Sequence, residues 1–155
     1  MKVIEPVTAI ELQQYYTLRW KILRAPWNQP RGSERDALDS CSTHLMVVAD
    51  NRKVIAAGRL HFNSIREAQL RYMAVDLQQQ RKGVGTLLLQ ALEQRAVTLG
   101  AAHIILDARE CALRFYRKNG YVAQGAGHVL FNTITHVQMT KSLDNLNRPA
   151  SAAHS

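Results

Sequence analysis

The stretch Gln80-Arg81-Lys82-Gly83-Val84-Gly85-Thr86 carries the residue types best suited to chemistry. Its two glycines remove side chains where a backbone would meet a ligand, and Arg81 and Lys82 add positive charge. Apolar residues at helical spacing run through and beyond it: Val84, Leu87, Leu88, Ala91 and Leu92. The first N–H groups of a helix lack partners inside the helix and lie at its positive end. This turn therefore suits an anionic group, above all a pyrophosphate.

Two commoner phosphate-binding motifs are excluded by their spacing. A P-loop places Lys directly after its second glycine, and neither Gly83 nor Gly85 is followed by Lys. A dinucleotide-binding fingerprint needs a third glycine where Leu88 stands. The pattern that remains is Gln-x-x-Gly-x-Gly. A tight turn without any ligand is the competing interpretation, and we favour the ligand site.

A second motif, Phe115-Tyr116-Arg117-Lys118-Asn119-Gly120-Tyr121, follows further along the chain. Together with Met73-Ala74-Val75-Asp76 ahead of the glycine turn, it resembles the GCN5-related N-acetyltransferase (GNAT) family, whose members bind acetyl-coenzyme A. The resemblance covers nearly the whole chain up to Lys141. Residues 18–24 and 29–36 also look like the acetyltransferase half of certain bacterial proteins that are fused to a thioesterase-like domain.

The resemblance implies a role for each residue of a cofactor site. The backbones of Met73 and Val75 would bind the pantetheine arm, and Tyr116 would act as general acid toward the departing thiolate. The implied cofactor-binding set is Met73, Val75, Gln80, Arg81, Lys82, Gly83, Val84, Gly85, Thr86 and Arg109, with the amides from Arg81 to Thr86 receiving the pyrophosphate. Arg109 departs from the family pattern, since many relatives carry Asn there. The phenol of Tyr116 is expected to keep a pKa near ten.

The general base is left open by the sequence. Gln69 stands where some relatives place a catalytic Glu, so deprotonation of the acceptor falls to another group or the acceptor arrives neutral. The candidates are Glu67, His61, His44, Glu34 and a water chain.

The acceptor is also left open. Four arginines, Arg19, Arg59, Arg71 and Arg109, hint at an anionic group in it. Arg19 lies on the apolar stripe of a helix, and for it we favour snorkelling to solvent or a structural ion pair over contact with the substrate.

Periodicity and turn signals predict the elements that position these residues. Thr8 and Glu11 form a capping box for a helix to about Arg24, a short helix starts at Ser33, and the glycine turn opens a helix that ends at Leu99-Gly100. A last helix runs from Arg109 through Asn119. The expected strands are Val3–Val7, Thr43–Ala49, Lys53–Phe62, Glu67–Val75, His103–Asp107, Tyr121–Ala126 and Phe131–Thr140.

The expected fold class is α/β with a mixed sheet. The strand at His103 follows a helical crossover, so it should be parallel to the strand before the glycine turn. The family resemblance implies a GNAT fold, in which a largely antiparallel sheet of six or seven strands packs with about four helices and two strands splay apart at the cofactor site. We expect residues 1–141 to form the acetyltransferase domain and residues 142–155 to form a disordered tail.

Composition narrows the expected partners, metal content and location of the protein. The 155 residues carry a net charge of +8, but Lys and Arg are scattered, so no specific nucleic-acid partner is expected. Cys41 and Cys111 have neither a disulfide framework nor metal-binding spacing, so reduced thiols and no metal are expected. The N-terminus lacks the apolar core of a signal peptide, and no apolar run reaches the length of a membrane span. We therefore expect a cytoplasmic protein without a membrane partner.

The implied function is transfer of an acetyl group from acetyl-coenzyme A to an amine of a small molecule or protein, by direct attack in a ternary complex. A homodimer is compatible with this. The alternative is a module that binds an acyl-coenzyme A or nucleic acid on the same scaffold without turnover. Tyr116 and the intact glycine turn favour the enzyme.

Overall fold

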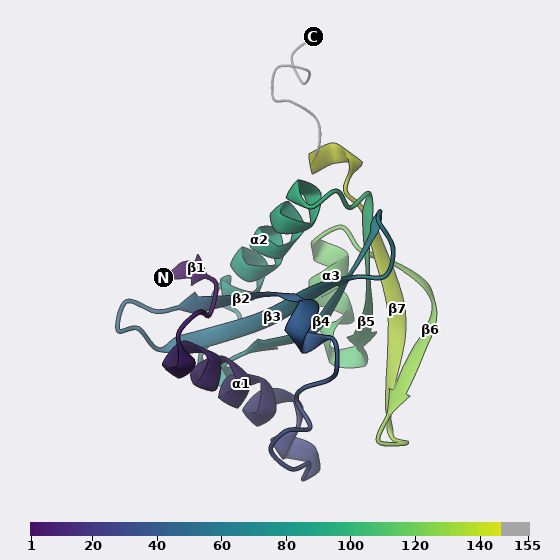
Figure 1. The fold of residues 1–155 in the computed structure, drawn as a ribbon. Coiled ribbons are helices and arrows are strands. Elements are labelled where there is room, and N and C mark those ends of the chain that lie inside the picture. The colour runs from purple at the N-terminus through teal and green to yellow at the C-terminus, as the bar shows by residue number, and fades with distance from the viewer. Residues whose placement is uncertain (147–155) are drawn as a thin grey trace. The chain divides into compact units, whose positions relative to one another are not determined.

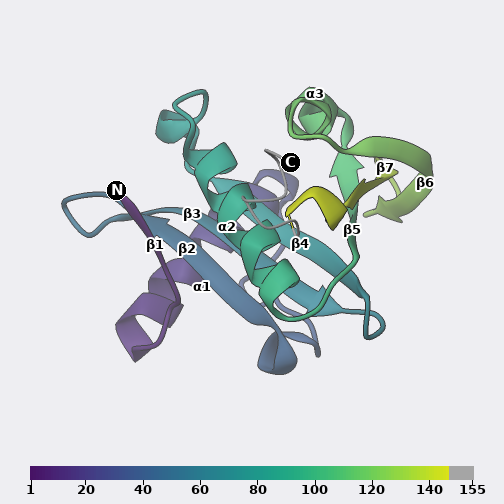
Figure 2. The ribbon, with the colours of Figure 1, turned by 90° about the horizontal axis from the view of Figure 1, so that it is seen from above.

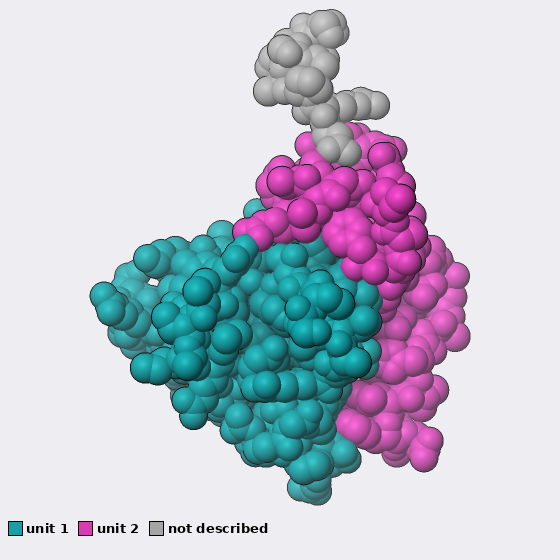
Figure 3. Space-filling view, viewed as in Figure 1, with its two compact units in different colours: residues 1–61, 71–92 teal, residues 62–70, 93–155 magenta. Residues whose placement is uncertain are grey.

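The computed structural model describes residues 1–146 and divides into two compact units, which are described separately (Figure 3). Unit 1 comprises Met1–His61 and Arg71–Leu92, and unit 2 comprises Phe62–Leu70 and the chain from Glu93 onward. The strand Glu67–Val75 contributes its first four residues to unit 2 and the rest to unit 1.

The elements form a seven-stranded mixed sheet with three α-helices, labelled in Figure 1. The predicted mixed α/β fold class is confirmed. The strands are β1 (Lys2–Ile4), β2 (Thr43–Val48), β3 (Val54–Phe62), β4 (Glu67–Val75), β5 (His103–Arg109), β6 (Val122–Leu130) and β7 (Ile134–Ser142), hydrogen-bonded in the order β1-β2-β3-β4-β5-β7-β6. The α-helices are α1 (Ala9–Leu23), α2 (Val84–Thr98) and α3 (Leu113–Lys118), and 3₁₀ turns are η1 (Ala25–Trp27), η2 (Asp39–Cys41), η3 (Leu77–Gln79), η4 (Glu110–Ala112) and η5 (Asp144–Leu146).

Helix α1 in unit 1 begins as its sequence predicts. The Thr8 hydroxyl accepts from the Glu11 N–H at 3.1 Å, and the Glu11 carboxylate accepts from the Thr8 N–H at 2.9 Å. This capping box satisfies two amides that the helix leaves unpaired. The buried face of α1, including Tyr15 and Leu18, packs with Met46 of β2 in one apolar cluster.

The segment after α1 differs from the prediction, because no helix forms from Ser33. The Asp39 carboxylate accepts from the Asp36 N–H at 2.7 Å, and the Asp36 carboxylate accepts from the Leu38 N–H at 2.9 Å. Such side-chain bonds satisfy the backbone locally and favour turns over a helix. Residues 31–38 therefore form turns and irregular structure that lead into η2.

Helix α2 packs on β3 through a glycine. A Cβ built at Gly58 would lie 2.8 Å from Leu92 Cδ1 and 3.3 Å from Leu88 Cδ2, whereas real Cβ atoms do not approach other atoms within 3.0 Å. Leu88 and Leu92 are fully buried, as the helical stripe in the sequence predicts. This packing fixes α2, and with it the helix start that follows the glycine turn.

Unit 2 is built around β5. Residues Glu67–Leu70 of β4 pair with His103–Leu106 in parallel, which confirms the predicted crossover. Strand β7 runs antiparallel along the whole of β5, and β6 lies beyond β7 (Figure 2). The Arg109–His136 pair extends β5 to Arg109, whereas the sequence predicted that Arg109-Glu110 opens a helix. Helical structure begins at Glu110 with η4, and helix α3 follows from Leu113.

The expected tail begins within ordered structure. Strand β7 runs to Ser142, and Leu143 is fully buried. The Leu143 N–H also donates to the Ala102 carbonyl at 2.8 Å. Packing therefore extends beyond the expected boundary at Lys141. The rest of that predicted tail, residues 147–155, lies outside the described residues.

Candidate functional site

The turn before α2 lies in unit 1 and contains two residues with positive φ. Arg81 has φ 66° and Gly83 has φ 81°, both in the left-handed region. Arg81 is a non-glycine residue in a conformation that costs free energy, and such outliers concentrate at functional sites. Arg81, Lys82 and Gly83 are exposed, so the turn and both cations face solvent.

The amides that begin α2 have no acceptor inside the helix. The helical pattern starts with the Leu87 N–H, which donates to the Gly83 carbonyl at 3.0 Å. The N–H groups of Val84, Gly85 and Thr86 precede that bond and lie at the positive end of the helix. These amides together with two exposed cations fit a pyrophosphate, so the residues present suit acetyl-coenzyme A.

The end of β4 leads directly into this turn. Met73 and Val75 alternate with the buried Tyr72 and Ala74 and are themselves half-buried. The Gln80 side-chain amide donates to the Val75 carbonyl at 3.3 Å, which ties the turn to the strand. Of the predicted cofactor-binding residues, all except Arg109 therefore lie in one continuous segment of unit 1.

Tyr116 and Arg109 lie in unit 2. The Tyr116 ring contacts the rings of Phe115 and Tyr121 edge-on, with centroids 5.1 and 5.6 Å away. Burial raises the pKa of Tyr116 well above its ordinary value, although the Arg109 charge acts in the opposite direction. The expectation of a pKa near ten is therefore corrected. A raised pKa keeps the phenol protonated, which is the form that a general acid needs.

All four residues named as base candidates have neighbours that engage them, beginning with Glu67 and Glu34. Glu67 accepts from Asn63 at 3.0 Å and contacts His103 at 2.9 Å, and hydrogen bonds from His103 and Asn63 lower its pKa. Glu34 is almost fully buried and accepts from the Gly32 N–H at 2.8 Å. Burial lowers the pKa of His44.

His44 is also held on both ring edges, while the fourth candidate, His61, is buried. The Nδ1 atom of His44 is 2.8 Å from the Tyr15 hydroxyl, and its Nε2 atom is 2.8 Å from the Asp39 carbonyl. His61 lies beside Arg59, with Nδ1 3.3 Å from an Arg59 nitrogen. Both imidazoles are parts of the packed interior of unit 1.

Two of the four arginines that were expected near an anionic acceptor group form ion pairs inside unit 1 instead. Arg19 and Arg59 are fully buried. Arg19 Nη1 donates to Asp39 Oδ1 at 2.9 Å, and Arg59 Nη1 donates to Asp36 Oδ1 at 2.6 Å. The structural ion pair favoured for Arg19 is thus observed. Arg71 remains partly exposed and donates to Asp36 Oδ2 at 3.2 Å.

Sequence reasoning missed both carboxylates of this network. Burial alone would raise the pKa of Asp36 and of Asp39, but hydrogen bonds from Arg59 and Arg19 hold both values below the ordinary one. The available signal was the pair of buried arginines itself, because a buried cation needs a carboxylate.

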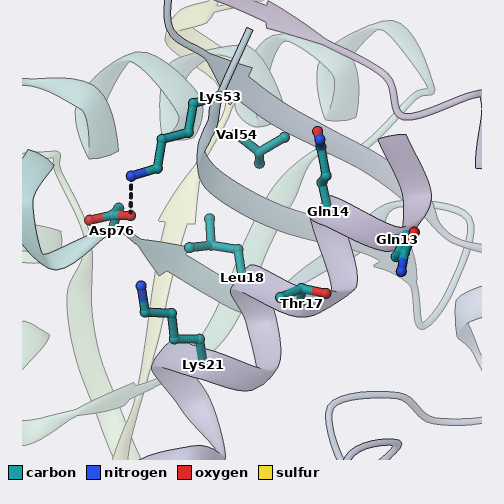
Figure 4. A pocket seen from close by; sticks show the side chains of 8 residues that line it. All are labelled: Gln13, Gln14, Thr17, Leu18, Lys21, Lys53, Val54 and Asp76. Atoms are coloured by element: carbon teal, nitrogen blue, oxygen red, sulfur yellow. Dashed lines mark ion pairs between the residues drawn. The ribbon is translucent and has the colours of Figure 1, made fainter. Parts of the chain in front are cut away.

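A shallow hollow of about 350 Å³ lies elsewhere in unit 1, beside α1 (Figure 4). It is lined by Gln13, Gln14, Thr17, Leu18, Lys21, Lys53, Val54 and Asp76. Lys53 Nζ is 3.7 Å from Asp76 Oδ2, the ion pair drawn in Figure 4. This hollow contains none of the residues that the sequence predicted for the cofactor or for catalysis.

Residues 1–146 also bear on two other classes of site, membrane spans and metal centres. No helix in that range combines the length and apolar character needed to cross a membrane. The same residues contain no group of three or more His, Cys, Asp or Glu side chains arranged to hold a metal ion.

Comparison with known proteins defines the family. Residues 28–143 match the model of the acetyltransferase (GNAT) domain. The uncharacterized N-acetyltransferase YjcF of Bacillus subtilis (strain 168) is 31% identical over 141 residues, which cover 91% of this chain and 99% of the relative. The chain therefore belongs to the GNAT acetyltransferase family. The predictions of an N-acetyltransferase and of acetyl-coenzyme A as its acyl donor are confirmed at the level of that family.

Solved structures show the same fold. A provisionally named N-acetyltransferase from Lactobacillus plantarum superposes with a TM-score of 0.80 at 22% identity, over 92% of this chain and 97% of that one. An aminoglycoside 6'-N-acetyltransferase complexed with coenzyme A superposes with a TM-score of 0.77 at 17% identity, over 96% and 99% of the two chains. The resemblance to proteins fused to a thioesterase-like domain has support only in its acetyltransferase part.

Proposed function

We propose that this protein transfers an acetyl group from acetyl-coenzyme A to an amine of a small molecule or a protein, by direct attack of the amine in a ternary complex. The observation that carries the proposal is the turn before α2, where Arg81 and Gly83 have positive φ and lead into amides that have no acceptor inside the helix. A turn of this kind suits a pyrophosphate, and the family uses acetyl-coenzyme A.

Each residue of the proposed site has one task. The amides from Arg81 to Thr86 hold the pyrophosphate, and the backbones of Met73 and Val75 hold the pantetheine arm. Tyr116 donates its phenolic proton to the departing sulfur. Because burial keeps that phenol neutral, the proton is present when the thiolate forms. Positioning of the amine beside the thioester supplies much of the remaining rate enhancement.

A cytoplasmic location is part of the proposal. Cys41 and Cys111 are both free and exposed, which suits a compartment that keeps thiols reduced. The net charge of +8 gives weak, salt-sensitive attraction to polyanions rather than sequence-selective binding of nucleic acid.

The test has a binding arm and a turnover arm. Acetyl-coenzyme A at about a hundredfold excess over its Kd should stabilise the protein by about 2.7 kcal/mol, which raises Tm by several degrees. Release of free thiol with a panel of amines, such as polyamines, aminoglycosides and lysine peptides, then reports transfer. A wild-type Tm unaffected by saturating acetyl-coenzyme A would overturn the proposed site. A shift without thiol release from any amine would favour the binding module instead.

A further inference from the structure

Unit 2 contains a carboxylate–imidazole pair that the sequence did not reveal. Asp107 Oδ2 lies 2.7 Å from His128 Nδ1. The His128 side chain is 40% exposed, whereas that of Asp107 is 16% exposed. With its Nδ1–H donating to the carboxylate, the ring presents Nε2 on its opposite edge as a proton acceptor.

A bulge in β6 brings His128 to this position. The register between β6 and β7 shifts between Ala126 and Val129, so His128 lies in the irregular segment. Asp107 stands on β5, across β7 from β6, and pairs directly with Gln138 of β7. Bulges re-aim side chains and recur beside active sites. Here the bulge turns the imidazole of β6 onto a carboxylate two strands away.

Gly127 makes the close approach possible. A Cβ built there would lie 2.7 Å from Asp107 Oδ1 and 2.9 Å from the Cβ of His136. Both distances are shorter than real Cβ contacts, so any side chain at this position would displace the carboxylate. Asp107 Oδ1 is itself buried and has no hydrogen-bond partner among the described residues.

The His136 ring packs against the His128 ring of the pair. Its ring stacks on His128 with centroids 4.2 Å apart and planes at 20°, and its Nδ1–H donates to the His128 carbonyl at 2.9 Å. Burial lowers the pKa of His136, and the charges of His128 and Arg109 act in the same direction. A neutral His136 places no second positive charge against the His128 ring.

Arg109 lies next to the pair in the sheet. Arg109 is the direct cross-strand neighbour of His136 and shares a face of β5 with Asp107. Its charge acts on Tyr116 as well as on His136. His128 thus contacts Asp107 and His136, and Arg109 is the strand neighbour of His136.

We propose that His128 is the general base of the transfer, with Asp107 and His136 as positioning residues. The proposal rests on the acetyl transfer proposed above. His128 Nε2 takes one proton from the acceptor ammonium, and the freed lone pair forms the C–N bond at the thioester carbon. As the C–S bond breaks, sulfur takes the Tyr116 proton. The second nitrogen proton restores the phenol through solvent, and His128 releases its proton to solvent.

The kinetic test compares His128→Gln with His103→Gln. His103 is a matched control, since its Nε2 lies 2.9 Å from the Glu67 carboxylate and its side chain is 39% exposed. We expect His128→Gln to lower kcat/KM by about 100-fold near neutral pH, with the acetyl-coenzyme A thermal shift retained. At about pH 11, where a lysine-type amine is largely neutral, the defect should disappear. His103→Gln should match the wild type. Loss of rate in His103→Gln alone, or a pH-independent loss in His128→Gln, would overturn the assignment.

A second measurement needs neither acceptor nor turnover. Diethyl pyrocarbonate acylates unprotonated imidazole nitrogen, and mass spectrometry gives a rate for each histidine. Orientation by a carboxylate should make His128 react several-fold faster in the wild type than in Asp107→Asn or Gly127→Ala, while the His103 rate stays constant. Equal His128 rates in folded wild-type and variant proteins would remove the pair from the mechanism. If acetyl-coenzyme A does not bind but the difference in His128 rates persists, the proposed acetyl transfer is wrong. The Asp107–His128 pair then still stands.

Discussion

Tyr116 and Tyr121 show how differently two phenols of one aromatic cluster can be used. The Tyr121 hydroxyl donates to Glu93 at 2.8 Å, and Glu93 also accepts from Lys141 at 3.0 Å. No hydrogen bond of the Tyr116 hydroxyl is found within residues 1–146, so its proton is not committed to the fold. Burial raises the pKa of both phenols. Only Tyr116 therefore combines a retained proton with an uncommitted hydroxyl.

Tyr116→Phe should separate the acid from the structural role, because it keeps the ring and deletes the proton. We expect kcat to fall by about 100-fold with little change in the affinity for acetyl-coenzyme A, measured by thermal shift. Tyr121→Phe is the control and should show the reverse, with nearly full turnover and a lower Tm. Unchanged kcat in Tyr116→Phe, under conditions where chemistry limits the rate, would reduce Tyr116 to a packing residue.

Among the structural elements, the turn before α2 makes the sharpest prediction. Gly83 has φ 81°, and a Cβ there would meet no atom within 4 Å, so Gly83→Val acts through the backbone and not through a clash. A β-branched residue costs about 1–2 kcal/mol in this conformation and tends to rebuild the turn. We expect a modest loss of Tm together with loss of the acetyl-coenzyme A thermal shift.

Gly100 offers a matched control at the other end of α2. It has φ 100°, and a Cβ there would likewise meet no atom within 4 Å. Gly100→Val should therefore lower Tm to a similar extent and keep the thermal shift. If both variants keep the shift, the pyrophosphate does not depend on this turn.

Local patterns predicted most elements, because apolar periodicity and caps act within a few residues. The capping box at Thr8, the alternating burial of β4 and the start of α2 follow directly from such patterns. The helix predicted from Ser33 failed because aspartate side chains satisfy that backbone. The His128 pair was missed because it depends on a bulge in the β6–β7 hairpin and on the pairing of β7 with β5, which is distant in the sequence. No local pattern specifies either alignment.

At the scale of the whole molecule, buried charge makes stability depend on pH. Arg19 is fully buried, and the Asp39 side chain that neutralises it is 9% exposed. The pKa of Asp39 is lowered in the folded protein, so the folded state binds its proton less readily than the unfolded state does. The stabilisation is therefore complete above the unfolded pKa of about 3.9 and is lost as the pH falls through the lower, folded value.

Asp39→Asn should expose this dependence in urea unfolding. Removing the charge leaves Arg19 buried without its counter-ion, which should cost about 3–5 kcal/mol near pH 7. Because wild-type Asp39 is itself protonated in strong acid, the difference between the two proteins should shrink as the pH falls below about 4. Asp50→Asn is the control: Asp50 pairs with the N-terminal amine but is 98% exposed, so its unfolding curve should overlay that of the wild type near pH 7. A difference for Asp39→Asn that stays constant from neutral to acid pH would assign the loss to side-chain shape and not to charge.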